Sequence, residues 1–274
     1  MPGRWRTAVA AAAIVLSAAH ATRPRMGAPG GSVQPCTVPP RHAGRGPVAL
    51  RPGEQLDYTV TYGPVHVGTG SMMLTTGDSL RGRATLHAAL RIDGGTFVFR
   101  VHDRIDSWFD AATLSSLRFT QHLREGGYHA DRVFEIFPDR AIYVHVGVDT
   151  AEASVAEPLD DASFLYFLRT ISLETGRRYE FWRYFQPESN PIVIRVLRRE
   201  QLTVPAGTFQ AVVLQPTIKA SGLFSNHGRA EVWLNAGGAH ELLQLKSHLA
   251  IGSLDLYLTR IGTVSAAGAS AASR

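Results

Sequence analysis

The segment Leu50-Arg-Pro-Gly-Glu-Gln-Leu-Asp-Tyr-Thr-Val-Thr-Tyr62 decides the fold class. Its apolar residues at positions 56, 58, 60 and 62 alternate with Asp57, Thr59 and Thr61, a period of two that is typical of a half-buried β-strand. Similar segments follow at close spacing, separated by turns that contain Gly, Pro, Asn or Asp, near residues 66–76, 83–93, 96–109, 115–124, 127–137, 140–147, 178–186, 191–203, 207–220, 228–235 and 240–262.

So many consecutive strands with little helix between them favour antiparallel pairing, because parallel strands need long crossover connections. The sequence therefore predicts a mainly β protein, either a large curved antiparallel sheet or an open β-barrel. One segment differs, since its apolar residues between Asp160 and Ile171 recur at helical spacing. Asp160 or Asp161 is suited to cap its first turn. One principal helix is expected at about 160–171, across the concave face of the sheet.

Residues 1–21 have the pattern of a secretory signal peptide. Arg4 and Arg6 precede a short run of Ala, Val, Ile and Leu, and Ala19-His20-Ala21 is a small-x-small cleavage pattern. Residues 22–49, rich in Pro, Gly and Arg, predict a disordered spacer, residues 50–263 a single β domain, and residues 264–274 a disordered tail. We predict export to the periplasm, with an extracellular location as the alternative, and no transmembrane segment after cleavage. A retained N-terminal anchor is the alternative to cleavage.

The basic surplus of the chain lies outside the predicted domain. The net charge is +5, but residues 1–51 hold seven arginines and no acidic residue, which leaves 21 basic against 23 acidic residues in 52–274. A nucleic-acid partner is excluded as the main one, because its phosphates call for cations clustered on the folded domain. The one cysteine, Cys36, falls in the spacer, so neither an intrachain disulfide nor thiol catalysis is expected.

The opening segment resembles the start of the DUF3108 family of uncharacterised exported bacterial proteins, a phrase like Leu-x-Pro-Gly-Glu-x-Leu-x-Tyr-x-Val-x-Tyr. This resemblance implies a β-rich exported domain and no established activity. The family usually has an acidic residue and an Arg-x-Pro after the last tryptophan, whereas Asn235-Ala-Gly-Gly-Ala-His-Glu241 stands here, which puts any site at that turn in doubt. Further similar segments follow in order: Val67-Gly-Thr-Gly70, Val101-His-Asp-Arg-Ile-Asp-Ser-Trp-Phe-Asp110, Glu125-Gly-Gly-Tyr128, Asp161-x-Ser163 with Tyr166-x-x-Arg169, Val204-Pro-Ala-Gly-Thr-Phe209 and Glu231-Val-Trp-Leu234.

The densest polar cluster is His102, Arg104 and Asp106, which strand alternation places on one face, with Asp103 on the other. Such a row could serve acid-base chemistry or bind an anionic ligand. A cross-strand charge ladder on a solvated face is the alternative. Arg169, near the end of the predicted helix, is a further candidate ligand contact, although the helix dipole alone favours a cation there.

Aromatic residues supply the remaining candidates. In a strand, Trp182 and Tyr184 share one face and Phe181 and Phe185 the other, so that one set could line a cavity for an apolar or sugar ligand. Trp233 is a third candidate. Packing in the core is the alternative for all of them.

The usual motifs of nucleophilic, nucleotide and zinc chemistry are missing from the sequence. It has no Gly-x-Ser-x-Gly and no Gly-x-x-x-x-Gly-Lys, and residue 244, where a second zinc-binding histidine would follow His240-Glu241, is glutamine. His122, Glu125 and His129 could converge across a hairpin, but the sequence fixes no further ligand. No metal and no cofactor are predicted.

These patterns predict a non-catalytic binding or scaffold module of the cell envelope, with an apolar groove on the curved sheet. Its expected partner is a lipid, a glycan or an envelope protein. The alternative is a hydrolase directed at the envelope or a polysaccharide, which would use carboxylates and the row His102-Arg104-Asp106.

Overall fold

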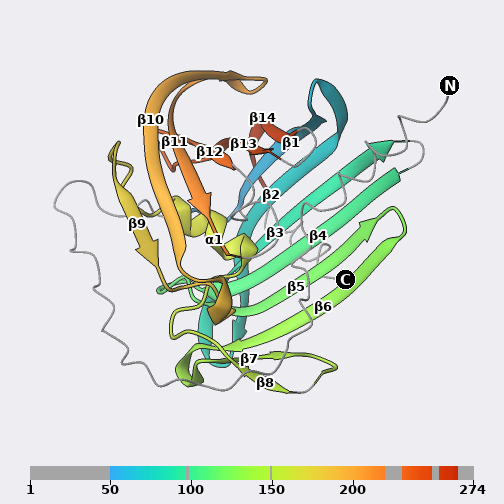
Figure 1. Ribbon diagram of the computed structural model, residues 1–274, viewed down its shortest axis with the longest axis vertical. Helices are drawn as coiled ribbons and strands as arrows, with labels where there is room; N and C mark the ends of the chain where they lie inside the picture. Colours follow the sequence, from blue (N-terminus) through green and yellow to red (C-terminus); the bar gives the residue numbers. More distant parts are fainter. Residues whose placement is uncertain (1–49, 97–98, 149, 220–229, 249–252, 265–274) are drawn as a thin grey trace.

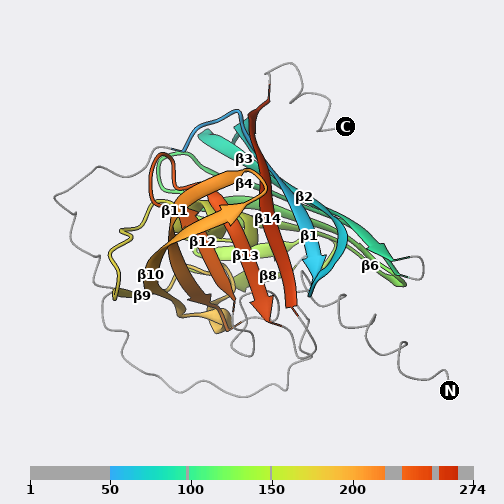
Figure 2. The ribbon, with the colours of Figure 1, turned by 90° about the horizontal axis from the view of Figure 1, so that it is seen from above.

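The computed structural model describes residues 50–96, 99–148, 150–219, 230–248 and 253–264. They form one antiparallel sheet of fourteen strands, which curls round a single α-helix of the described residues, α1 (Asp161–Leu168) (Figures 1 and 2). The strands are β1 (Glu54–Tyr62), β2 (Val65–Leu80), β3 (Arg83–Thr96), β4 (Phe99–Asp110), β5 (Ser116–Glu125), β6 (Tyr128–Phe137), β7 (Ile142–His145), β8 (Ala151–Ala153), β9 (Arg178–Phe181), β10 (Ile192–Val204), β11 (Gly207–Thr217), β12 (Glu231–Asn235), β13 (Leu242–His248) and β14 (Ser253–Thr263).

The sheet is open, with the order β8-β7-β6-β5-β4-β3-β2-β1-β14-β13-β12-β11-β10-β9. Consecutive strands pair with each other except β8 and β9, which lie at opposite edges of the sheet. Strand β1 pairs with both β2 and β14, and so joins the first described strands to the last one. The predicted curved antiparallel sheet is confirmed. Two short strands, β8 and β9, form its free edges.

Several elements differ from those predicted. The segment 240–262 is two strands, β13 and β14, because the chain turns back between them. The strand predicted at 178–186 ends at Phe181, and β8, with only three residues, was not predicted. The helix ends at Leu168 rather than near residue 171, because the amides of Arg169 and Thr170 bond to carbonyls three residues back and so close its last turn.

The helix α1 fills part of the concave face. Side chains from Ala162 to Leu168 are all buried, and α1 packs against β3 and β4. Asp160 caps it as predicted: its Oδ1 accepts from the amides of Ala162 and Ser163, and Oγ of Ser163 accepts from the amide of Asp160. Because Ser107 of β4 donates to the other oxygen of Asp160 at 2.5 Å, the cap also fixes the helix to the sheet.

A backbone hydrogen bond holds the hairpin of β10 and β11 against β14. Its tip curls over so that the amide of Ala206 donates to the carbonyl of Leu258 in β14 at 3.0 Å. The tip lies within the segment Val204–Phe209, and Val204 is buried while Phe209 packs against the core. The β10–β11 hairpin therefore covers a stretch of β14 that β13 does not reach.

Candidate functional site

The predicted row on β4 lies on one face of the strand, the outer face, but its members do not act together. Arg104 binds Asp106 through Nε at 2.5 Å and Nη2 at 3.0 Å, whereas His102 faces Asp93 of β3 at 2.9 Å. Asp106 also binds Nε2 of His87 at 2.8 Å, and the ring of His87 stacks on Trp108. The row is thus divided between two cross-strand pairs.

Asp106 is a buried carboxylate with two cationic or polar donors. Burial opposes its ionisation, but the hydrogen bonds from His87 and Arg104 outweigh burial and lower the pKa of Asp106. A carboxyl group held ionised in this way is a poor proton donor or acceptor near neutral pH. The arrangement suits a structural ion pair.

Arg169 lies in the interior rather than at the surface. Its guanidinium binds both oxygens of Glu54 in β1, at 2.5 and 2.8 Å, and donates twice to the carbonyl of Ala239, at 2.9 and 3.1 Å. The side chain is 0% exposed and that of Glu54 is 8% exposed. The pair joins the opening strand, the end of α1 and the turn before β13, so every one of these contacts is internal to the fold.

The aromatic candidates also differ in their exposure to solvent. Trp182 is 55% exposed, whereas Tyr184 is buried, so the prediction that they share one strand face is wrong. The reason is that β9 ends at Phe181, and Tyr184 is held instead by Asn190, whose side chain bonds to its amide and carbonyl. Trp233 is buried and donates through Nε1 to Glu200 at 2.6 Å.

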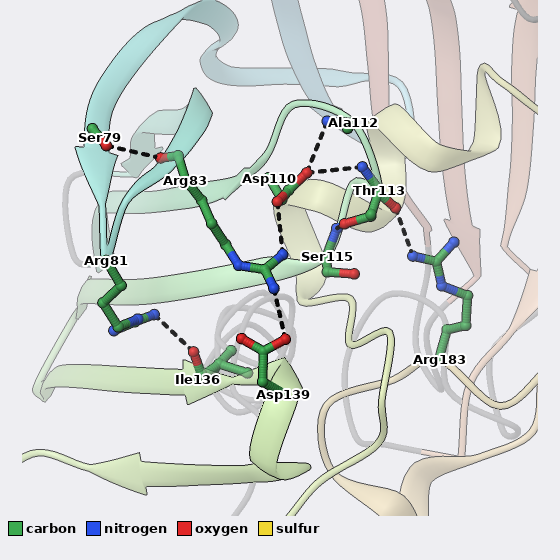
Figure 3. Close-up of polar contacts among 10 residues, drawn as sticks. All are labelled: Ser79, Arg81, Arg83, Asp110, Ala112, Thr113, Ser115, Ile136, Asp139 and Arg183. Atoms are coloured by element: carbon green, nitrogen blue, oxygen red, sulfur yellow. Dashed lines mark hydrogen bonds and ion pairs between the residues drawn. The ribbon is translucent and has the colours of Figure 1, made fainter.

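Polar contacts fix the strand ends that lie beside the start of α1. The close-up in Figure 3 shows Arg83 of β3 between Asp110 and Asp139, at 2.9 and 2.6 Å. Asp110 also accepts from the amides of Ala112 and Thr113, which orders the turn between β4 and β5. This end of β3–β6 is therefore tied together by side chains.

The opposite ends of the same strands carry a buried pair of carboxyl groups, Asp103 of β4 and Glu125 of β5. They are 4% and 2% exposed and are hydrogen-bonded to each other. Burial, then the charge and the hydrogen bond of Asp103, raise the pKa of Glu125 to about 8, and burial also raises that of Asp103. Both carboxyl groups therefore keep their protons to a higher pH than free carboxyl groups do.

Sequence reasoning missed this pair. It placed Asp103 correctly on the face opposite His102, but Asp103 and Glu125 are brought together only by the register of β4 and β5, in which Val101 faces Glu125. The position of Asp103 on the same strand face as Ile105 was the one signal that pointed to an acidic group on the concave face.

Apolar side chains surround the carboxyl pair on the concave face. Ile92 lies directly opposite Asp103, and Val101 directly opposite Glu125, while Leu90 lies one step nearer to α1. All three apolar side chains are half-buried. We name Leu90, Ile92, Val101, Asp103 and Glu125 the distal strip. In Figure 1 the strands β3–β6 extend beyond α1 toward this end.

Two glycines face each other at the end of the distal strip. A Cβ atom on Gly68 of β2 or on Gly94 of β3 would collide with the backbone of the facing strand. The two strands therefore approach closely here, and neither glycine places a side chain beside Val101, which pairs with Gly94.

His122 and Glu125, which the sequence left open as converging residues, lie on opposite faces of β5. His122 binds Asp131 at 2.8 Å on the outer face, while Glu125 is on the concave face. Among the described residues, no group of three or more His, Cys, Asp and Glu side chains could hold a metal ion.

A family model for proteins of unknown function, DUF3108, matches residues 57–259. The chain belongs to the DUF3108 family. The resemblance that the sequence segments indicated is thereby confirmed. The pairs Glu54–Arg169 and Asp103–Glu125 each join two of those segments. No curated protein matches the chain.

Three solved structures are similar in part. A β-barrel-like protein of the domain of unknown function DUF1849 from Brucella abortus has 8% identity and a TM-score of 0.48, covering 77% of this chain and 98% of its own. A protein described as exported, with a YmcC-like fold, from Bacteroides fragilis has 9% identity and a TM-score of 0.36, covering 79% and 99%. A protein described as a lipoprotein from Parabacteroides distasonis has 9% identity and a TM-score of 0.34, covering 79% and 97%. All three TM-scores lie below 0.5, too low to establish a shared fold.

The described part of the chain contains no helix with the length and hydropathy of a membrane span.

Proposed function

We propose that this DUF3108 protein is an exported, periplasmic binding module without catalytic activity, and that it binds a lipid-like amphiphile on the distal strip. The proposal includes the organisation expected from the sequence: a signal peptide at 1–21, a spacer at 22–49, one domain at 50–263 and a tail at 264–274. The leader pattern supports export, and the place of the domain within the chain is consistent with the family match at 57–259.

The observation that carries the proposal is the distal strip. Three half-buried aliphatic side chains on the concave face adjoin two buried carboxyl groups, while α1 covers another part of that face over β3 and β4. Ligand sites commonly combine an apolar surface with a few placed polar groups. Leu90, Ile92 and Val101 suit an alkyl chain better than a sugar, which stacks on aromatic faces.

The residues first predicted as a site support binding over hydrolysis. Arg104 and Asp106 bind each other, and His102 faces Asp93. The guanidinium of Arg169 binds the carboxylate of Glu54 and the carbonyl of Ala239. Each of these groups is held by a partner within the fold, which favours structural roles for them. The proposed binding surface therefore lies on the opposite face of β3 and β4 from His102 and Arg104.

The test is the binding of a fluorescent apolar probe, N-phenylnaphthylamine, to the exported, purified chain. Ile92→Glu places a charge on the distal strip, and Arg91→Glu, on the outer face of the same strand, is the matched control. We expect saturable probe binding by the wild type and by Arg91→Glu, and at least about a tenfold loss for Ile92→Glu, since a buried unpaired charge opposes apolar binding. Equal binding by all three proteins would refute the assignment of the surface.

A further inference from the structure

We propose that the amphiphile bound by the distal strip carries a primary ammonium group, held by the carboxyl groups of Asp103 and Glu125. This inference rests on the proposed function and names the chemistry of the ligand's polar end. It is carried by the geometry of the pair: two carboxyl groups in contact, both more than nine-tenths buried, beside an apolar surface.

The hydrogen bonding of the pair is incomplete. Oδ1 of Asp103 accepts from the amide of Arg124 at 2.9 Å. Oε2 of Glu125 is buried and has no hydrogen-bond partner among the described residues. A buried acceptor without a donor is costly, so this oxygen is the place where a donor from a ligand gains most.

The pair also lacks a cation in direct contact. No ion pair joins either carboxyl group to a cation of the described residues. Nearby cations have other partners: the guanidinium of Arg124 binds Asp131, and His102 binds Asp93 on the outer face. Arg132, on the concave face of β6, donates to Gln121 and to the hydroxyl of Tyr128.

A primary ammonium group can supply both the missing hydrogen-bond donor and the missing cation. It brings a single positive charge and three donors, one of which can serve Oε2 of Glu125. A phosphate or carboxylate headgroup would instead place an anion beside two carboxyl groups and offer no donor when ionised. A divalent metal ion is a poorer match, because calcium takes six to eight oxygen ligands and two carboxyl groups supply few of them.

The experiment compares two ligands that differ only at the polar end, dodecylamine and 1-dodecanol, as competitors of N-phenylnaphthylamine at pH 7. The proteins are the wild type, the double variant Asp103→Asn with Glu125→Gln, and Glu180→Gln, which removes a surface carboxylate from the distant edge strand β9. We expect the amine to bind the wild type about ten- to a hundredfold more tightly than the alcohol, the range for a charge-assisted hydrogen bond. The double variant, which removes both carboxyl groups of the pair, should reduce this ratio to about one, while Glu180→Gln keeps it.

The outcomes separate the two proposals. If neither ligand displaces the probe, the proposed function fails. If both bind the wild type equally, or if Glu180→Gln lowers the ratio as much as the double variant does, the binding surface stands and the ammonium site is overturned. The melting temperature of each variant shows that the loss is not due to unfolding.

Discussion

Replacement of Arg169 by methionine tests how far the buried ion pair holds this fold together. The substitution keeps much of the side-chain volume but leaves the carboxylate of Glu54 buried without its cation and the carbonyl of Ala239 without its two donors. Breaking one side of a buried pair costs about 3–5 kcal/mol. An unpaired buried carbonyl adds about 1–3 kcal/mol.

We therefore expect Arg169→Met to lower the free energy of unfolding by about 4–8 kcal/mol, out of the roughly 5–15 kcal/mol that a domain possesses. The double variant Glu54→Leu with Arg169→Met removes both charges. It should recover most of the loss, because apolar replacement of a whole buried pair is often neutral. Only the carbonyl of Ala239 then stays unpaired.

The assay is urea unfolding followed by tryptophan fluorescence and far-ultraviolet circular dichroism, on the wild type, both single variants and the double variant. Equal slopes with denaturant would show that the extent of the folded structure is unchanged. A loss below about 1 kcal/mol for Arg169→Met, or a double variant as unstable as the sum of the single ones, would refute the role given to the pair.

Three further predictions concern the carboxyl pair, the helix cap and the exposed tryptophan. Because the pKa of Glu125 is raised to about 8, its contribution to stability is present below about pH 4.5 and is lost as the pH rises toward 8. The loss is at most about 1.4 kcal/mol per pH unit. This slope should be absent in Glu125→Gln, and parallel pH profiles of the two proteins in urea unfolding would contradict it. Asp160→Ala should lower the free energy of unfolding in urea by about 2 kcal/mol, since two helix amides and Ser107 lose their acceptor. A loss under about 0.5 kcal/mol would contradict the role of Asp160 as the cap. Trp182→Ser should change the melting temperature little, because the side chain is 55% exposed; a fall above about 5 °C would show that it packs in the fold.

Local patterns in the sequence predict the elements of this fold well. The strands follow from alternation, and the start of α1 follows from Asp160 and Ser163, whose spacing allows a capping box within a few residues of chain. The end of the helix was harder to predict, because Ile171 continues the apolar spacing while the chain already turns at Arg169. Strand β8 was missed since three residues show no period.

The candidate site depends on contacts between distant segments, which the sequence does not display. Glu54 and Arg169 are 115 residues apart, and Asp103 meets Glu125 only through the register of two strands. The break after Phe181 likewise depends on Asn190, which holds Tyr184 in the interior. Alternation could therefore assign a residue to a face of its strand, but it could not name the residue opposite.

The most direct test of the binding surface is methyl nuclear magnetic resonance of the protein labelled at Ile, Leu and Val, titrated with dodecylamine. We predict saturable shifts at one equivalent for Ile92, Leu90 and Val101, while Ile194, which is buried in β10, keeps its position. Shifts confined to the exposed Val146 and Val148, or shifts that grow without saturation, would contradict the claim that the distal strip binds an amphiphile.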